Sequence, residues 1–350
     1  MDDFVGWCTN EKRGRVWGVQ KRSGFTAVAF PNHFREESYR SLSFLKSGIV
    51  RRTWTRRIKE SKYLRYTRLL QPEPRIWSRE EGALPGCLII GAQRSGTTFL
   101  HDLLALRTSA VRSPLQKEIH FFDNKYYRGV EWYAQFFESL RDRPPAAKNF
   151  EASPYYLYHP AVPERVRESL PGVKVVAVLR DPVERAISQY KWIRQAGLET
   201  RGAVEAFQYD AERLGWEQDP EYLGRFEDPL YFDFDHIHLG YLRRSLYDVQ
   251  LHRWRQHFSA SQIRVVGSNT LFEHPETVVD ELVPFLGIER DDHEGGRPIN
   301  QNSSRTDTTV PPEALEIAAK HLGDVASNVR GVVTDEMIVG EDLRLGQRTI

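Results

Sequence analysis

A glycine-bearing loop between two apolar segments is the part of this chain whose residues most clearly indicate chemistry. Residues 91–98 read GAQRSGTT and stand between the apolar run 87–90 and a helical pattern that begins at Phe99. Glycines let such a loop curl, and the first unpaired N–H groups of the following helix point at an anion. The loop is therefore predicted to bind phosphate. The candidate binding residues in it are Gln93, Arg94, Ser95, Gly96, Thr97 and Thr98.

The loop differs at one position from that of ATP-hydrolysing and GTP-hydrolysing proteins. Its spacing nearly matches G-x-x-x-x-G-K-[ST], but Thr97 stands where the lysine would be. Without that lysine the chain lacks the main group that neutralises the β- and γ-phosphates of a nucleoside triphosphate. The cation is instead Arg94, which suits a 5′-phosphate carrying a single terminal group. A divergent P-loop kinase or NTPase, dependent on ATP and Mg²⁺, stays open as an alternative.

A second polar site is predicted where another apolar run ends. Residues 173–179 read VKVVAVL, a composition typical of a parallel strand covered on both faces, and Arg180 follows directly. Ligands of open parallel sheets bind at this end of the strands. A helix is predicted to start there, with Asp181 as its N-cap, Pro182 as its first residue and Glu184 as the capping partner.

This helix is predicted to carry a polar stripe. Four polar residues fall at i, i+3, i+4 and i+7 along it, namely Asp181, Glu184, Arg185 and Ser188. Residues at this spacing share one helix face. We therefore expect Arg180 and Ser188 to face the same cleft and to share a second phosphate.

Together the two motifs resemble those of the sulfotransferases that use 3′-phosphoadenosine 5′-phosphosulfate (PAPS). Residues 91–98 are similar to the loop that binds the 5′-phosphosulfate. Residues 180–190, RDPVERAISQY, are similar to the 3′-phosphate motif R-D-P-x-x-R-x-x-S-x-Y. The resemblance is closest to the heparan-sulfate N- and 3-O-sulfotransferase-like group, because residues 117–123 (KEIHFFD) and 129–133 (GVEWY) are similar to that group's segment after the loop.

The resemblance implies a fold, a donor and a reaction. The fold is an α/β domain over residues 85–350, with a P-loop-like parallel β-sheet flanked by helices on both faces. Residues 1–80 lie outside the resemblance, and their charge and pattern predict a basic, partly helical N-terminal extension. The enzyme moves the sulfuryl group of PAPS to a hydroxyl or amine, releases adenosine 3′,5′-bisphosphate and requires no metal. The acceptor is expected to be a small molecule or a glycan, with a carbohydrate or glycoconjugate favoured.

The resemblance also assigns roles to single residues. The loop holds the 5′-phosphosulfate, Arg180 and Ser188 hold the 3′-phosphate, and Glu118 is the catalytic base. A loose match to the loop that closes over the nucleotide adds Ser304 and Arg305 as binding residues.

Two positions depart from the group's pattern. The loop cation, usually lysine in that group, is Arg94, whose planar fork is not equivalent to the point charge of an ammonium. In addition, Glu151 is followed by Ala152, where the heparan O-sulfotransferases have a lysine.

Sulfuryl transfer depends mainly on positioning and charge stabilisation, as phosphoryl transfer does. We expect Arg94 to contact the oxygen that bridges sulfur and the 5′-phosphate, and Glu118 to remove the acceptor's proton. His120, two residues later in an extended segment, presents its side chain on the same side. Three roles stay open for His120: orienting Glu118, contacting the acceptor, or acting as the base. His101 is expected to pack rather than react.

The rest of the chain alternates strand and helix patterns. Helices are predicted over residues 241–257 and 275–286, a strand over 263–266, and a last helix that opens at Pro311 and Pro312. Alternation of this kind favours a parallel sheet with helices on both faces.

Composition places the chain among ordinary globular proteins. Its 350 residues are 40% hydrophobic, and its two cysteines, Cys8 and Cys87, argue against a disulfide framework or a cysteine zinc site. No apolar run approaches the roughly 18 residues of a membrane span, and no signal-peptide pattern opens the chain. We predict a cytoplasmic protein in which Cys87 is a small buried hydrophobe.

A net charge of +1 conceals a basic N-terminal segment, because residues 1–80 hold 18 Lys and Arg against 8 Asp and Glu. Residues 1–45 are predicted to be irregular and residues 43–70 helical. We interpret the segment as a solvated basic helix, with a peripheral contact to an anionic partner as the alternative. No nucleic-acid-binding signature accompanies the charge, so no nucleic-acid partner is predicted. The sequence indicates no oligomeric state.

One alternative is not an enzyme at all. A non-catalytic protein would use the same pocket to bind a nucleotide and the basic segment to hold a polyanion. For the enzyme, four aromatic residues are candidates for stacking on sugar rings, although aromatics at this density more often form core. They are Trp132, Tyr155, Tyr156 and Tyr158.

Overall fold

The computed structural model describes residues 6–10, 15–19, 29–30, 83–291, 309–340, 343 and 345. The chain divides into two units, Met1–Gln71 with Leu230–Phe232 and Pro72–Pro229 with Asp233–Ile350.

In the first unit, the described residues form a small antiparallel sheet in the order β1-β2-β3. Its strands are β1 (Gly6–Asn10), β2 (Arg15–Val19) and β3 (Ala29–Phe30). The irregular structure predicted for residues 1–45 was therefore wrong at these strands, because strands this short leave no sustained periodicity in the sequence. The helix predicted over residues 43–70 lies outside the described residues.

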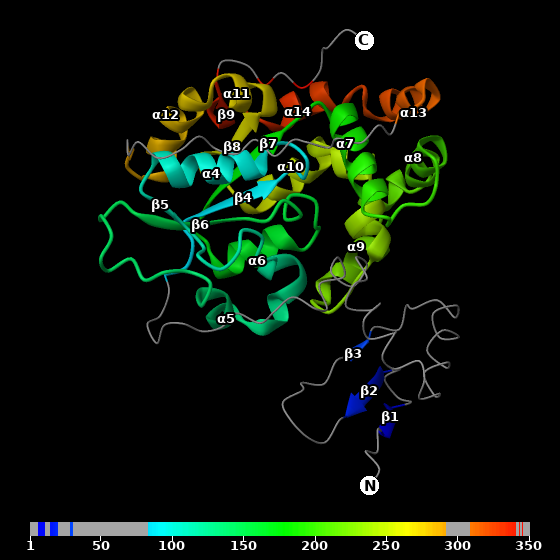
Figure 1. Ribbon diagram of the computed structural model, residues 1–350, viewed down its shortest axis with the longest axis horizontal. Coiled ribbons are helices and arrows are strands. Elements are labelled where there is room, and N and C mark those ends of the chain that lie inside the picture. The colour runs from blue at the N-terminus through cyan, green and yellow to red at the C-terminus, as the bar shows by residue number, and fades with distance from the viewer. Residues whose placement is uncertain are drawn as a thin grey trace. The chain divides into compact units, whose positions relative to one another are not determined.

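The second unit is built around a six-stranded parallel sheet in the order β5-β6-β4-β7-β8-β9 (Figure 1). Each of its strand pairings is parallel, as the alternating pattern predicts. The strands are β4 (Cys87–Gly91), β5 (Ala110–Arg112), β6 (Lys148–Ala152), β7 (Lys174–Leu179), β8 (Ile263–Gly267) and β9 (Ile338–Val339).

The strand order creates the place where a ligand is expected. From β4 the chain runs out to β5 and back to β6 on one side, and it then crosses to β7, β8 and β9 on the other side. The connections that leave β4 and β7 therefore diverge, and in open α/β sheets the crevice between such connections binds ligands. The predicted phosphate loop leaves β4, and Arg180 leaves β7, so the two motifs lie at the same edge of two neighbouring parallel strands, where this rule expects a ligand.

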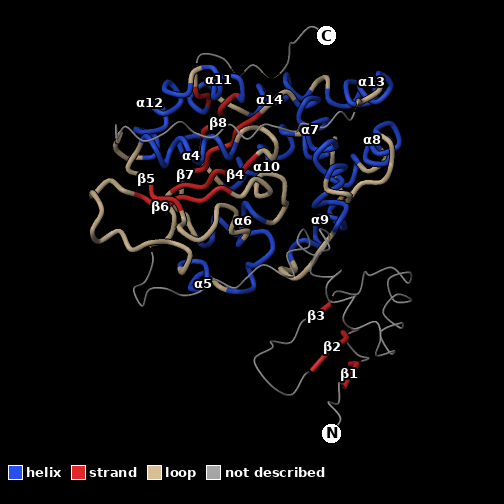
Figure 2. Tube along the Cα trace, in the orientation of Figure 1, coloured by secondary structure: helices blue, strands red, loops and turns tan. Residues whose placement is uncertain are grey.

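Helices cover both faces of the sheet, as predicted (Figure 2). The described α-helices of the second unit are α4 (Thr97–Arg107), α5 (Val130–Ala134), α6 (Val162–Ser169), α7 (Pro182–Gln195), α8 (Ala203–Ala211), α9 (Pro220–Gly224), α10 (Tyr247–His257), α11 (Ser268–Glu273), α12 (Pro275–Leu286), α13 (Pro312–Leu322) and α14 (Val325–Val332). Short 3-10 and π-helical turns connect them, namely η2 (Phe121–Lys125), η3 (Tyr126–Arg128), η4 (Leu214–Gln218), η5 (Arg225–Glu227), η6 (Asp235–Leu239), η7 (Arg243–Ser245), η8 (Ala260–Gln262) and η9 (Asp335–Met337).

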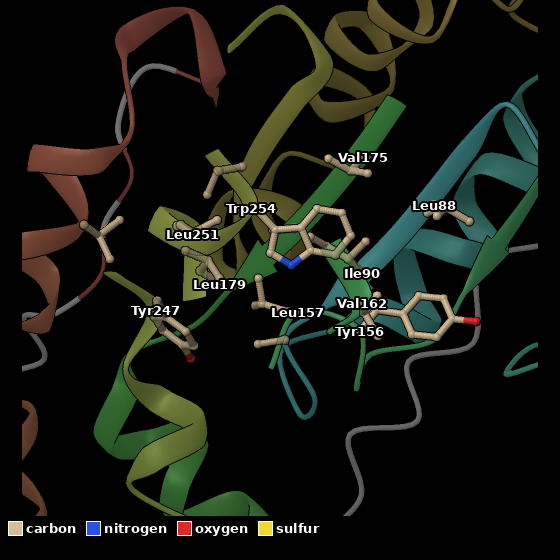
Figure 3. Close-up of a cluster of buried hydrophobic side chains, with 14 of the residues drawn as sticks. Leu88, Ile90, Tyr156, Leu157, Val162, Val175, Leu179, Tyr247, Leu251 and Trp254 are labelled. Carbon is tan, nitrogen blue, oxygen red and sulfur yellow. The ribbon is translucent and has the colours of Figure 1, made fainter. Parts of the chain in front are cut away.

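The core has two parts because successive strand residues point to opposite faces. Leu88 and Ile90 of β4 join the larger cluster, which includes side chains of α6, α7, α10 and α13. Figure 3 shows part of it, with Trp254 of α10 beside the sheet. Cys87 and Ile89 join the other cluster, with side chains of α4 and α12. Cys87 is buried, as predicted, and this burial raises the pKa of its thiol to about 12.

The strands predicted over residues 87–90, 173–179 and 263–266 are confirmed within one residue at each end, and α12 has its predicted bounds. Two helix predictions were wrong in part. The helix predicted from Tyr241 begins at Tyr247, and the helix that opens at Pro312 is followed by α14. None of the described helices combines the length and apolar character needed to cross a membrane. The cytoplasmic location stays a prediction.

Candidate active site

The phosphate loop leads into the start of α4 as predicted. Gly96 is the N-cap of α4 with a φ of 106°, a backbone conformation that favours glycine, and no side chain caps this helix end. Ser95 and Thr97 are buried. Because buried polar atoms normally have hydrogen-bond partners, unpartnered ones at a helix N-terminus indicate a ligand site. Within the described part of the chain, Gln93 Oε1 is such an atom, and the hydroxyl groups of Ser95 and Tyr247 interact with each other beside it.

Arg94 extends from this loop to α7. Its Nε donates a hydrogen bond to Ser188 Oγ over 3.1 Å, which brings the two predicted phosphate motifs together. Burial, and then the positive charge of Arg180, lower the pKa of Arg94. Two guanidinium groups therefore lie close enough to repel each other, and an anion bound beside them would relieve that repulsion. These residues fit a ligand with more than one phosphate or sulfate group.

The start of α7 has the predicted cap, but the polar stripe is different from the prediction. Asp181 accepts a hydrogen bond from the Glu184 N–H over 2.8 Å, and Arg180 Nη2 donates to Glu184 Oε2 over 2.8 Å. Arg185 does not face the cleft. It is fully buried, donates from Nε to Ser245 Oγ over 2.6 Å, and also donates to the Tyr241 carbonyl. Arg185 thus fixes residues 241–245 to α7, which explains why α10 begins later than predicted.

Glu118, His120 and Asp123 form a connected row of side chains. His120 Nε2 lies 3.1 Å from Glu118 Oε2, and His120 Nδ1 lies 2.6 Å from Asp123 Oδ2. The exposed fraction falls along the row, from 43% for the Glu118 side chain to 4% for His120 and 0% for Asp123. An exposed carboxylate backed by an oriented imidazole is an arrangement that can accept a proton. The expectation that Glu118 and His120 lie on the same side is confirmed.

Asp123 was missed by the sequence predictions, although it lies in the segment 117–123 that they single out. The signal was its spacing, because the third residue after His120 lies within reach once a helical turn begins. That turn is η2 (Phe121–Lys125).

Residues of β6 and of the segment after it bond to the backbone that carries this row. Glu151 is buried at the end of β6, where Glu151 Oε1 accepts from the Ile119 N–H over 3.3 Å and from the Tyr156 hydroxyl over 2.9 Å. The His120 N–H donates to Ser153 Oγ over 3.2 Å. Burial raises the pKa of Glu151, against the lowering effect of hydrogen bonds from Ser153, Tyr133 and Tyr156.

The aromatic side chains proposed to stack on sugars lie mostly in the core. Tyr155, Tyr156 and Tyr158 are buried, so these three do not offer a face to an acceptor. Trp132 is half-buried, and its ring lies 6.3 Å from that of Phe121. The Tyr156 hydroxyl donates to Glu151, whereas the hydroxyls of Tyr155 and Tyr158 bond to His236 and Glu217.

Arg94 and His120 are the two non-glycine residues with positive φ in the described part of the chain, at 72° and 57°. Such conformations cost on the order of 1–3 kcal/mol each, and they cluster at functional sites. Both residues were predicted from the sequence as catalytic. The two non-glycine residues with positive φ are therefore also two of the residues predicted to be catalytic.

Lys117 is a second residue that the sequence predictions missed. Its Nζ donates to Thr98 Oγ1 on α4 over 3.0 Å and to Glu118 Oε1 over 3.2 Å. The side chain is 20% exposed. Lys117 therefore connects the phosphate loop with the row of Glu118, His120 and Asp123.

The other predicted residues are placed as follows. His101 is buried, bonded through Nδ1 to Asp102 at 3.1 Å and packed on the ring of Phe150, in agreement with a packing role. Ser304 and Arg305 lie outside the described residues, so their predicted contact with the nucleotide stays a prediction.

Comparisons with known proteins agree on one family. The model of the sulfotransferase domain matches residues 84–307. The bifunctional heparan sulfate N-deacetylase/N-sulfotransferase 4 of Mus musculus is 32% identical over 226 residues, which are 61% of this chain and 24% of that protein. The heparan sulfate glucosamine 3-O-sulfotransferase 5 of Mus musculus is 29% identical over 207 residues, which are 59% of this chain and 54% of that protein. The match thus spans about a quarter of the length of the first relative and about half of the length of the second.

A solved structure shows the same fold. The sulfotransferase from Alicyclobacillus acidocaldarius aligns with a TM-score of 0.53 at 23% identity, over 72% of this chain and 96% of that one. This likeness supports the architecture of a parallel sheet between two layers of helices.

Proposed function

The chain belongs to the sulfotransferase domain family, and from that membership we propose that it transfers a sulfuryl group from PAPS to a hydroxyl or amine of a glycan. One observation carries the proposal: the hydrogen bond between Arg94 and Ser188 joins the two segments that the sequence predicts to bind phosphate. PAPS carries phosphate groups at the 5′ and the 3′ position of one ribose, so its binding needs two such motifs side by side. A nucleoside triphosphate would need the loop lysine that Thr97 replaces.

Each motif has a part in binding the donor. The loop residues 93–98 present N–H groups and buried hydroxyls to the 5′-phosphosulfate. Arg180 and Ser188 hold the 3′-phosphate, and Arg94 lies between the two sites, within reach of Ser188. PAPS supplies an activated sulfuryl group when it is bound there.

Glu118 is the proposed general base, and His120 and Asp123 orient it. In the reaction, the acceptor oxygen or nitrogen bonds to sulfur while the bond between sulfur and the 5′-phosphate oxygen breaks. The electron pair leaves with adenosine 3′,5′-bisphosphate, and the acceptor's proton passes to Glu118. His120 Nε2 lies 3.1 Å from Glu118 Oε2 and His120 Nδ1 lies 2.6 Å from Asp123 Oδ2, so contacts at both ring nitrogens hold the imidazole beside the proposed base.

A carbohydrate acceptor is proposed from the relatives. Both are named for heparan sulfate or its glucosamine residues. Of the four aromatic residues named from the sequence, Trp132 is the one that is not fully buried, although Phe121 stacks on its ring and Lys125 and Arg128 also lie over it. Because the chain spans only part of the length of these relatives, the acceptor has to be established by assay.

Transfer of radiolabelled sulfate from PAPS to defined oligosaccharides tests the proposal. We expect labelled product with heparosan oligosaccharides carrying free glucosamine amines or hydroxyls, and none with Glu118→Gln. Labelling of a small alcohol or phenol with every oligosaccharide unlabelled would keep the sulfuryl transfer but reject the glycan. No labelling of any acceptor, together with release of phosphate from ATP, would reject the transfer itself.

A further inference from the structure

Lys117 has contacts that none of the predicted motifs explains. It follows the phosphate loop by 19 residues and still bonds to it, through Thr98 Oγ1 at 3.0 Å. Its other partner is the candidate base, through Glu118 Oε1 at 3.2 Å. One ammonium group therefore spans the distance between the group that holds the donor and the group that deprotonates the acceptor.

The arginines of the site lie on the other side. Arg94 Nε bonds to Ser188 on α7, and Arg180 bonds to Glu184 on the same helix. Both guanidinium groups are therefore bonded to α7, which carries the predicted 3′-phosphate motif. The cation bonded to both Thr98 and Glu118 is Lys117.

In the proposed reaction, the sulfuryl group passes between the start of α4 and Glu118. In-line transfer places the sulfur between the leaving oxygen, held over the start of α4, and the acceptor atom beside Glu118. Lys117 Nζ is bonded to one residue at each of these two places, Thr98 of α4 and Glu118. A lysine ammonium has three donors, and Thr98 and Glu118 use two of them, so a third can bond to an oxygen of the donor.

We propose that Lys117 is a catalytic residue that contacts the sulfuryl oxygens and stabilises the negative charge that develops on them and on the leaving oxygen. The inference rests on the proposed function. The acceptor atom bonds to sulfur as the bond from sulfur to the 5′-phosphate oxygen breaks with its electron pair. The acceptor's proton passes to Glu118, and Lys117 keeps its protons throughout. In this role Lys117 takes the place that the sequence assigns to Arg94.

If Lys117 has this role, its replacement should weaken the binding of PAPS more than the binding of adenosine 3′,5′-bisphosphate. Adenosine 3′,5′-bisphosphate has both phosphates of PAPS but no sulfuryl group. Replacing Lys117 by methionine removes the charge and keeps much of the side-chain length. The variant should therefore bind the bisphosphate nearly as well as the wild type does, and bind PAPS about tenfold more weakly, since a hydrogen bond to a charged group is lost.

The experiment measures both affinities by calorimetry, and turnover of PAPS, for the wild type, Lys117→Met, Lys117→Arg and Lys320→Ala. Lys320 is an exposed lysine of α13 and serves as the control for loss of a lysine charge. In Lys117→Met we expect turnover to fall about 10²- to 10³-fold, as when a group that stabilises developing charge is removed. Lys117→Arg should recover part of that loss because it keeps the charge, and Lys320→Ala should match the wild type.

The outcomes separate this inference from the proposed function. A wild type that binds neither nucleotide rejects both. If the wild type binds both, and Lys117→Met loses affinity for the bisphosphate as much as for PAPS, then Lys117 only supports the loop through Thr98. Unchanged turnover in Lys117→Met also overturns the catalytic role.

Discussion

At the scale of single residues, Glu118 has the surroundings that a general base requires. One of its oxygens is bonded to His120 and the other to Lys117, and the side chain still reaches solvent, where an acceptor arrives. The sequence predicts Glu118 and His120 because both lie in one short motif. Asp123 and Lys117 were missed because their roles depend on a turn at Phe121 and on the approach of α4, neither of which the motif specifies.

The prediction for Glu118→Gln is a selective loss of catalysis. The amide keeps the shape of the carboxylate but cannot take a proton, so turnover should fall about 10²- to 10⁴-fold. Binding of adenosine 3′,5′-bisphosphate should not change, because Glu118 does not belong to either phosphate motif. Steady-state rates and calorimetry on the same preparations check this, with Glu316→Gln on the exposed face of α13 as the control. A variant that turns over PAPS at the wild-type rate would exclude Glu118 as the base.

At the scale of elements, β6 is the part of the fold that the sequence did not predict and that the site depends on. Its five residues, Lys148–Ala152, include Asn149 and Glu151, which are polar and yet buried. A strand of this composition lacks the apolar run that identifies β4 and β7. Glu151 is accepted in the core because backbone and hydroxyl donors surround its carboxyl group.

Glu151 should make the stability of the protein depend on pH. Its pKa in the folded state is raised above the ordinary value of 4.5, so the folded state binds more protons than the unfolded state above pH 4.5. This contribution to stability is fully present below pH 4.5 and is lost as the pH rises through the raised pKa. Urea denaturation of Glu151→Gln at a series of pH values should lack this fall. The exposed Glu164 of α6, changed to Gln, should keep it; an identical pH profile for Glu151→Gln and the wild type would contradict the assignment.

Gly91 provides a test of how β4 leads into the phosphate loop. A Cβ on Gly91 would lie 2.6 Å from Leu157 Cβ and 3.0 Å from the Pro154 carbonyl oxygen, so Gly91→Ala must shift either the end of β4 or the segment 154–157. We expect a loss of about 1–3 kcal/mol in the free energy of unfolding, as for other overpacked sites. Bisphosphate binding should weaken as well.

Gly172→Ala is the matched control for this change, because a Cβ at Gly172 has no neighbour within 4 Å. Denaturation curves and calorimetry compare the two variants. Full bisphosphate affinity in Gly91→Ala would show that the loop does not need this close approach.

At the scale of the whole molecule, the sequence predicts the sheet and its two helix layers because three strands are long apolar runs and several helices have clear start signals. It does not predict the strand order, which depends on pairings between distant segments. That order is what brings Arg94 to Ser188. The basic segment of residues 1–80 lies outside the match to the sulfotransferase domain, and a peripheral contact of this segment with an anionic partner stays a prediction.

The most direct test of the central claim is a thermal denaturation series of the full chain with adenosine 3′,5′-bisphosphate, ADP and ATP, each with and without Mg²⁺. A ligand that binds the native state and is present at about 100 times its Kd adds roughly 2.7 kcal/mol to stability. We predict that the bisphosphate raises Tm without metal and that ADP and ATP do not. Stabilisation by Mg-ATP alone would contradict the proposed donor site and identify the loop as that of a divergent NTPase.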